Sequence, residues 1–313
     1  MKPTLYAALG ATPGWKHIAA LAACLLAFAG PAQAIVAKTN ADLLSGSGQP
    51  FLDGVAKLII TGSEGTFGCS GSLLTGGTSI LTAAHCVTGA DGAATTSNIA
   101  VSLLGGTVTT SSNSYVVDPG WNGSLLGGND LALIHLSQPI ASITGYGLYF
   151  ASAQNSTVVL AGYGYTGNGT TGSVSGTFGT LHYGSNQYDG ADPSVSSIYL
   201  YDFDNGTPGF NKFGSLGLGS AEVLIAPGDS GGPGLIEAGG HWYVAGVHSF
   251  DSCSRGTCPI NSSFGEVAGD ISVFGQSAWL QSVTAPVPEP ETYAMLMAGL
   301  GLVAAFAMRR RVL

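Results

Sequence analysis

Charged side chains are scarce in this sequence, and basic ones are the scarcest. Lys, Arg, Asp and Glu make up 9% of the 313 residues, against roughly 25% in an average globular protein. Residues 35–285 carry 4 basic and 16 acidic side chains, a formal charge of −12. Such an acidic body repels phosphate and offers no basic patch, which excludes nucleic acid as a partner. We interpret the acidity as a contribution to solubility.

Cysteine is also sparse. The chain has five cysteines, of which Cys24 lies in an apolar run near the N-terminus. The other four are Cys69, Cys86, Cys253 and Cys258. They form no thiolate cluster with the spacing of a zinc site, so the sequence implies no metal and no cofactor. An even number of cysteines in an exported chain favours disulfides and an oxidising compartment.

Long hydrophobic runs are missing too, because neither apolar segment reaches the ~20 residues of a membrane-spanning helix. The first segment, Ile18–Ala29, follows Lys2 and Lys16 and precedes an Ala-x-Ala site that ends at Ala34. This order predicts that residues 1–34 are a signal peptide, which signal peptidase removes. The alternative is an uncleaved membrane anchor, for which this apolar run is short.

The second apolar segment, Tyr293–Met308, lies in a C-terminal stretch at residues 293–313 that ends with the cluster Arg309–Arg311. A linker at residues 286–292 with the sequence Pro288-Glu289-Pro290 precedes it. This order resembles the PEP-CTERM sorting signals of Gram-negative bacteria. The resemblance implies transient association with the inner membrane through this helix until an exosortase processes the chain. The protein would then reside in the periplasm, at the cell surface or in the extracellular matrix. A plain C-terminal anchor is the alternative.

Short apolar runs separated by glycine-rich turns fill residues 35–285, and the chain has 49 glycines. This composition favours many short strands over helices. The expected strands are Val55–Thr61, Ser79–Thr82, Asn98–Leu104, Ser114–Val117, Leu131–Leu136, Thr157–Gly162, Ser197–Tyr201, Trp242–Val247 and Ile271–Phe274. One amphipathic helix is expected at about Gly275–Val283. The pattern predicts an all-β fold of antiparallel sheets or barrels.

Three motifs occur along the chain in the order His, Asp, Ser. Thr82-Ala83-Ala84-His85-Cys86 follows a strand-like run, Asn129-Asp130-Leu131-Ala132-Leu133 opens another, and Gly228-Asp229-Ser230-Gly231-Gly232-Pro233 comes last. A serine hydroxyl is a poor nucleophile at neutral pH and needs a base within hydrogen-bonding reach, for which the pKa of histidine is suited. His85, Asp130 and Ser230 are therefore the candidate catalytic residues.

These motifs resemble those of the chymotrypsin/trypsin-like serine peptidases, and the resemblance covers about residues 54–283. It implies two antiparallel six-stranded Greek-key β-barrels with a short C-terminal helix over residues 35–285. It also implies a secreted serine endopeptidase that hydrolyses protein or peptide substrates through an acyl-enzyme. Ser230 would be the nucleophile, His85 the base and Asp130 the residue that orients His85. The alternative is a catalytically silent surface or matrix-binding protein on the same scaffold.

The resemblance also assigns roles to residues around the nucleophile. The backbone N–H groups of Gly228 and Ser230 would form the oxyanion hole, with glycine at 228 because the substrate must approach that backbone closely. Ser249 matches the position that supports the aspartate. The family places the base of the specificity pocket at Leu224, where an aspartate would bind Arg or Lys. With leucine there and Asp251 expected near the pocket wall, we predict non-tryptic specificity for a small or apolar P1 residue.

Two disulfides follow from the same resemblance. Cys69 and Cys86 match a disulfide beside the catalytic histidine. A second family disulfide near the nucleophile is absent because Ala226 stands at its upstream position, and a local Cys253–Cys258 link is expected to replace it. The acidic calcium-binding loop of some relatives is not recognisable at residues 97–107, so no metal is expected there.

Asp229 matches the residue that pairs, in this family, with the α-amino group released by activation cleavage at an Ile-Val sequence. Signal cleavage after Ala34 would expose Ile35-Val36. We therefore predict that export yields an active enzyme with Ile35 at its N-terminus. The alternative is that Ile35 merely follows a signal-peptide site. The prediction requires a looped-out insertion between Ile35 and Cys69, which are farther apart than is usual in the family.

Overall fold

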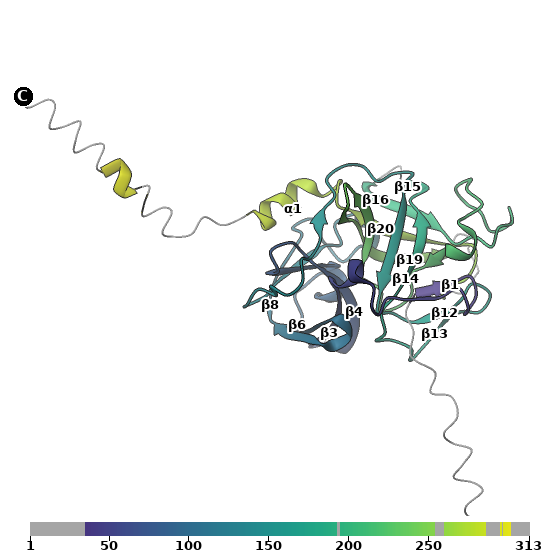
Figure 1. The fold of residues 1–313 in the computed structure, drawn as a ribbon, viewed down its shortest axis with the longest axis horizontal. Helices are drawn as coiled ribbons and strands as arrows, with labels where there is room; N and C mark the ends of the chain where they lie inside the picture. Colours follow the sequence, from purple (N-terminus) through teal and green to yellow (C-terminus); the bar gives the residue numbers. More distant parts are fainter. Residues whose placement is uncertain (1–34, 193–194, 254–259, 286–294, 296, 302–313) are drawn as a thin grey trace, which may run out of the picture.

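The structure, a computed structural model, describes residues 35–192, 195–253, 260–285, 295 and 297–301 (Figure 1). Two β-rich halves lie side by side, with the strands between residues 55 and 135 in one, and the later strands together with the start of the described chain in the other. The predicted signal peptide, the predicted linker at residues 286–292, Cys258 and most of residues 293–313 lie outside the described residues. Within the described part of the chain, no helix is long and apolar enough to cross a membrane.

The first half is a seven-stranded antiparallel sheet in the order β7-β6-β3-β4-β5-β9-β8. Its strands are β3 (Val55–Gly62), β4 (Gly65–Leu73), β5 (Ser79–Thr82), β6 (Thr96–Leu103), β7 (Val108–Ser112), β8 (Ser114–Val117) and β9 (Ala132–His135). Along β3, Leu58 and Ile60 are buried while Thr61 is exposed, as the two-residue period of a strand requires. The buried side chains pack into a core that includes Ile80, Ile99, Val101 and Ile134.

The second half is a nine-stranded sheet in the order β15-β16-β20-β19-β18-β11-β14-β2, with β10 paired to β19. Its strands are β2 (Leu44–Ser45), β10 (Gly147–Leu148), β11 (Thr157–Gly162), β14 (His182–Gln187), β15 (Gly190–Asp192), β16 (Val195–Asp202), β18 (Pro233–Ala238), β19 (His241–Cys253) and β20 (Glu266–Ser272). Its core includes Leu160, Tyr188, Tyr201, Phe203 and Ala245.

A small third sheet receives the start of the described chain. Its order is β13-β12-β1-β17, formed by β1 (Ile35–Ala37), β12 (Thr166–Asn168), β13 (Gly172–Val174) and β17 (Val223–Leu224). β1 runs parallel to β12 and antiparallel to β17. All three β1 residues are 0% exposed. The Ile-Val sequence is therefore inserted into the second half.

The remaining elements are short helices and the apolar layer between the halves. The helices are η1 (Pro50–Leu52), η2 (Ala84–Cys86), η3 (Leu104–Gly106), η4 (Leu125–Gly127), η5 (Gly219–Ala221) and α1 (Ser277–Thr284). A third hydrophobic cluster joins first-half residues such as Leu81 and Leu133 to second-half residues such as Leu235 and Val247, and Leu280 of α1 packs into it. This layer fixes the two halves against each other.

The predicted all-β fold with a short C-terminal helix is confirmed. The strand numbers differ from the expected six in each half: the first sheet has seven strands, and the short strands β2, β10 and β15 are among the nine of the second. The segment between Ile35 and Cys69, where an insertion was expected, packs in part on the second half. Leu44 pairs with Tyr183 across β2 and β14, and the Phe51 ring stacks on Trp242 with 4.8 Å between ring centroids.

Candidate active site

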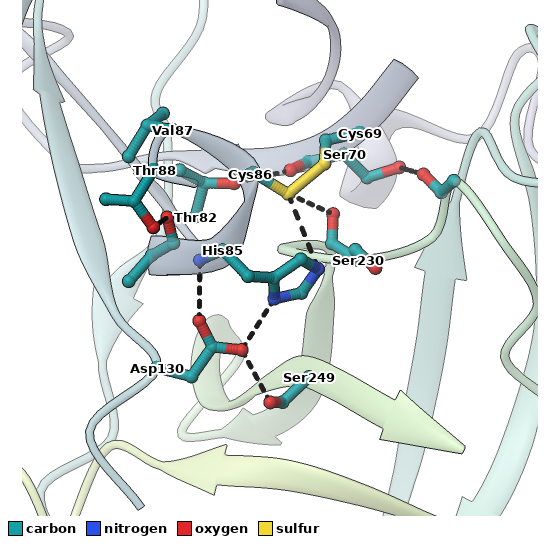
Figure 2. The surroundings of a disulfide bond; sticks show 12 residues. Cys69, Ser70, Thr82, His85, Cys86, Val87, Thr88, Asp130, Ser230 and Ser249 are labelled. Carbon is teal, nitrogen blue, oxygen red and sulfur yellow. Dashed lines mark hydrogen bonds and ion pairs between the residues drawn. A yellow bond between two sulfur atoms is a disulfide. The ribbon is translucent and has the colours of Figure 1, made fainter. Parts of the chain in front are cut away.

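His85 and Asp130, both from the first half, form a hydrogen-bonded pair (Figure 2). His85 lies in η2 after β5, and Asp130 precedes β9, the strand that pairs with β5. The distance from His85 Nδ1 to Asp130 Oδ2 is 2.7 Å, and the His85 backbone N–H donates to Asp130 Oδ1 at 2.8 Å. The carboxylate therefore orients both the ring and the backbone of the histidine.

Ser249 adds a third hydrogen bond to the fully buried Asp130. Its hydroxyl, on β19 of the second half, donates to Asp130 Oδ2 at 2.6 Å (Figure 2). The His85 side chain remains 27% exposed. Burial by itself lowers the pKa of His85, but the charge and hydrogen bond of Asp130 outweigh it, so the pKa lies above its usual value. The site therefore favours the imidazolium that a general base becomes.

Ser230 comes from the second half and lies on the other side of the imidazole from Asp130 (Figure 2). Its loop is fastened to the first half by Ser70 on β4. The Ser70 backbone N–H donates to the Ser230 carbonyl at 2.8 Å, and the Ser70 hydroxyl donates to the Gly228 carbonyl at 2.9 Å. Among the described residues the Ser230 hydroxyl makes no hydrogen bond to His85, and such bonds often tighten only when substrate binds.

Two backbone N–H groups in this loop are available to a ligand. The carbonyl groups of Pro227 and Asp229 each accept a backbone hydrogen bond at 2.8 Å. In a planar trans peptide the N–H points opposite to the C=O, so the N–H groups of Gly228 and Ser230 point away from these contacts. Neither N–H has a partner within the described residues. Such a pair of donors can stabilise a negatively charged oxygen.

The predicted Cys69–Cys86 disulfide is present, with the two Cα atoms 6.3 Å apart. Cys86 Sγ lies 4.0 Å from His85 Nε2 and 3.6 Å from the Ser230 carbonyl oxygen (Figure 2). The disulfide thus packs against both candidate catalytic residues. Cys69, His85 and Cys86 bring potential metal ligands together, but both sulfurs are used in the disulfide and no thiolate remains. The predicted Cys253–Cys258 link involves Cys258, which lies outside the described residues.

Asp229, which precedes the candidate nucleophile, is fully buried. Its carboxylate accepts hydrogen bonds from the backbone N–H groups of Gly164 at 2.7 Å and Ala226 at 2.9 Å. The backbone N–H of Ile35 also donates to it. Burial raises the pKa of Asp229 to about 6, and these N–H groups and the charge of His248 limit the rise. Asp229 and Ile35, predicted as an activation pair, are therefore in contact.

Comparisons with known proteins agree with this architecture. The family model described as Trypsin matches residues 47–263. The chain belongs to the trypsin family. Membership of this protease family implies that the substrates of the chain are peptides. The model described as the PEP-CTERM protein-sorting motif matches residues 286–311, which indicates an exported protein that an exosortase sorts to the cell surface.

Solved structures of proteases share the trypsin-family fold. HL collagenase has a TM-score of 0.55 and 20% identity, covering 80% of this chain and 99% of its own. The protease Anisep from Arthrobacter nicotinovorans has a TM-score of 0.52 and 18% identity, covering 74% and 93%. The thermostable serine protease AL20 from an extremophilic microorganism has a TM-score of 0.53 and 15% identity, covering 76% and 100%. A search of curated proteins found no match.

A buried polar network lies behind the nucleophile loop of this trypsin-family chain. His248 Nδ1 lies 2.9 Å from Asp270 Oδ1, and the hydroxyls of Tyr188 and Tyr201 donate to Asp270 at 2.5 Å and 2.9 Å. All four residues are 0% exposed. The His248 backbone exchanges hydrogen bonds with Gly231 and Gly232, at 2.8 Å and 2.9 Å. The network therefore supports the loop that carries Ser230.

The two predicted pocket residues lie in different surroundings. Leu224 is 0% exposed and pairs with Val36 across β17 and β1. Asp251 on β19 is half-buried, and the Ser262 hydroxyl donates to it at 3.1 Å. Burial, together with the charge of Glu266, raises the pKa of Asp251 to about 6.

Sequence reasoning missed Ser70 and the Asp270 network. Ser70 follows Cys69 in a glycine-rich segment and has no motif of its own. Asp270 meets Tyr188 and Tyr201 from 82 and 69 positions away. His248, which the motif around Ser249 includes, was the available clue, because a histidine inside an apolar strand requires a buried partner.

Proposed function

We propose that this trypsin-family chain is a serine endopeptidase with Ser230 as its nucleophile. The observation that carries the proposal is the meeting of Ser230 from one half with the His85–Asp130 pair from the other (Figure 2). His85 would take the Ser230 proton as Oγ attacks the scissile carbonyl, and would pass it to the leaving amine. Water would then hydrolyse the acyl-enzyme. The N–H groups of Gly228 and Ser230 would hold the oxyanion.

Fluorophosphonate labelling with intact-mass analysis tests this proposal. We expect the wild type to take one label and to cleave casein, and Ser230→Ala to take none and to lose about 10⁶-fold in kcat. The exposed Ser137→Ala is the matched control and should behave as the wild type. A folded wild type that takes no label would contradict the proposal and leave the alternative of a matrix-binding protein.

We also propose that Ile35 is the N-terminus of the active enzyme. Ile35 has φ +66°, a conformation that is strained for a β-branched residue inside a chain. Cleavage of the Ala34–Ile35 bond removes the preceding carbonyl and with it this strain. It also turns the N–H that contacts Asp229 into a charged amino group, which is a stronger partner for a buried carboxylate.

A removable N-terminal extension tests the role of Ile35. We expect a protein with extra residues before Ile35 to label slowly, and to reach the full labelling rate once a specific protease exposes Ile35. Edman sequencing of the exported enzyme should begin Ile-Val. Full activity with the extension in place would contradict the proposal.

Non-tryptic specificity is the final part of the proposed function. The side chain at the expected pocket base is Leu224, which offers no charge to Arg or Lys. A peptide library should therefore show cleavage after small or apolar residues. Cleavage mainly after Arg or Lys would refute this specificity without affecting the proposed nucleophile.

A further inference from the structure

Four acidic side chains that the proposed chemistry does not use gather in the second half. Asp202 ends β16, Asp204 follows it, Glu222 precedes β17, and Asp189 lies between β14 and β15. Asp202, Asp204 and Glu222 are 2%, 1% and 1% exposed, and Asp189 is half-buried. We call these four residues the acidic cluster. Asp202 and Asp204 stand at the start of the segment at residues 203–222, and Glu222 stands at its end. This segment leads into the nucleophile loop.

The carboxylates of the acidic cluster act on one another. Burial, together with the charges of Asp202 and Asp189, raises the pKa of Asp204 to about 6. Burial, together with the charges of Asp204 and Asp202, raises the pKa of Glu222 to about 7, although backbone N–H groups of Asp204 and Leu218 limit the rise. The neighbouring negative charges therefore disfavour the ionised forms of Asp204 and Glu222.

Within the described residues, no basic side chain forms an ion pair with the acidic cluster. Both ion pairs of the described residues join a histidine to an aspartate elsewhere, so no cluster carboxylate has a basic group within 4.0 Å in that part of the chain. The charge of Lys212 acts on Asp202 from a greater distance. Lys38 approaches the same segment at Gly206, where its Nζ would lie 3.9 Å from an added Cβ.

Asp204 is the member of the acidic cluster whose carboxylate has no hydrogen-bond partner within the described residues. Both of its carboxylate oxygens are buried there and accept no hydrogen bond from that part of the chain. By contrast, Asp202 accepts from the Lys212 backbone N–H, and Glu222 accepts from the backbone N–H groups of Asp204 and Leu218, each at 2.6 Å. A buried carboxylate without a donor is strongly unfavourable unless a cation or a proton compensates its charge.

The backbone at Gly217 brings Asp204 and Glu222 together. Gly217 has φ +81°, and a Cβ there would overlap Glu222 Oε2 and lie 2.8 Å from Asp204 Cβ. Both acidic side chains therefore lie against a glycine that leaves no room for a side chain. A side chain at position 217 would therefore overlap both acidic side chains.

We propose that the acidic cluster binds one Ca²⁺ ion, with Asp204 as its principal ligand. Ca²⁺ takes about six to eight oxygen ligands in flexible geometry, whereas Mg²⁺ requires a near-ideal octahedron. No three cluster side chains bring ligand atoms within 4.8 Å of one another among the described residues, so backbone carbonyls and water would complete the coordination. The bound ion would fasten residues 203–222. This site is separate from residues 97–107, where no calcium loop is recognisable.

Thermal unfolding of the mature chain tests the proposal in a Ser230→Ala background, which removes self-cleavage and makes the result independent of the proposed peptidase activity. After EGTA treatment, about 10 mM CaCl₂ should raise the Tm by about 5 °C or more. MgCl₂ and NaCl at equal ionic strength should not. Asp204→Asn should abolish the Ca²⁺ response, while Glu237→Gln, which neutralises an exposed carboxylate on β18, should keep it.

Equilibrium dialysis with radioactive Ca²⁺ provides the second measurement. We expect one ion per chain in the Asp204-containing protein and in Glu237→Gln, and none in Asp204→Asn. Absence of both bound Ca²⁺ and a Tm response in the Asp204-containing protein would overturn the proposal even if Asp204→Asn fails to fold. Retention of the Ca²⁺ response in a folded Asp204→Asn variant, or an equal response to all three salts, would overturn it as well.

Discussion

Asp270 and Asp204 are both buried carboxylates of the second half, and they differ in their partners. Asp270 accepts hydrogen bonds from two tyrosine hydroxyls and pairs with His248, whereas Asp204 accepts none within the described residues. Behind the nucleophile loop, the protein itself supplies every donor that the carboxylate needs. In the acidic cluster, backbone N–H groups serve Asp202 and Glu222, but the described residues give Asp204 no donor. The comparison therefore separates carboxylates that position neighbouring groups from one that requires a ligand.

Asp130 and Asp229 belong to the partnered class. Asp130 accepts hydrogen bonds from His85 and Ser249, and Asp229 accepts from Gly164, Ala226 and Ile35. Each contact holds a group that the proposed mechanism needs in one position. Removing the negative charge from a partnered carboxylate should therefore cost activity or stability, and removing it from Asp204 in the absence of Ca²⁺ should not.

The largest effect is expected for Asp130→Asn. By analogy with the serine-peptidase triad, for which this value is established, kcat should fall about 10⁴-fold because the amide no longer holds the correct tautomer of His85. The pKa of His85 should also fall, since burial lowers it once the charge and hydrogen bond of Asp130 are gone. The acid limb of the kcat/KM profile should therefore move to lower pH.

Full pH–rate profiles of Asp130→Asn and of the exposed Asp91→Asn measure this effect. The control should retain both the rate and the position of the acid limb. An Asp130→Asn enzyme with wild-type kcat would show that the His85–Asp130 contact has no catalytic role.

The next largest effect is expected for Asp229→Asn. The amide keeps the size of the side chain but cannot pair with a charged amino group at Ile35. The donors of Gly228 and Ser230 should then lose their fixed positions, and loss of oxyanion stabilisation typically lowers rates about 10²–10³-fold. Fluorophosphonate labelling rates of Asp229→Asn and the exposed Asp91→Asn provide the test. Equal labelling rates in the two variants would show that Asp229 has no part in the proposed activation.

A smaller effect is expected for Tyr201→Phe, which removes one hydrogen bond to Asp270 and leaves the ring in place. Hydrogen bonds to charged groups contribute about 1.5–3 kcal/mol, so the free energy of unfolding should fall by that amount. Urea denaturation compares this variant with Tyr243→Phe, at a half-buried position, which should be near wild type. An unchanged unfolding free energy in Tyr201→Phe would mean that the Asp270 network is not a stabilising unit.

Local motifs made part of this molecule predictable from its sequence. The candidate catalytic residues stand in short runs with characteristic neighbours, and the short apolar runs of β5, β8 and β11 have the predicted bounds. β14, with the sequence His-Tyr-Gly-Ser-Asn-Gln, has no such apolar run, and β4 is interrupted by glycines. The hydrogen bond between Ser70 and Gly228 joins residues 158 positions apart. No local pattern encodes such contacts, because tertiary packing creates them.

The smallest effect, and the one of opposite sign, is expected for the unpartnered carboxylate. In EGTA, Asp204→Asn removes a buried charge that no donor stabilises and reduces its repulsion of Asp202 and Glu222. The free energy of unfolding should therefore stay unchanged or rise by up to about 1 kcal/mol. Asp270→Asn, measured under the same conditions, should lower it, because His248 and two tyrosines lose a charged partner. Equal destabilisation in both variants would show that Asp204 is positioned by contacts of the same kind as Asp270, and the distinction between the two sites would fail.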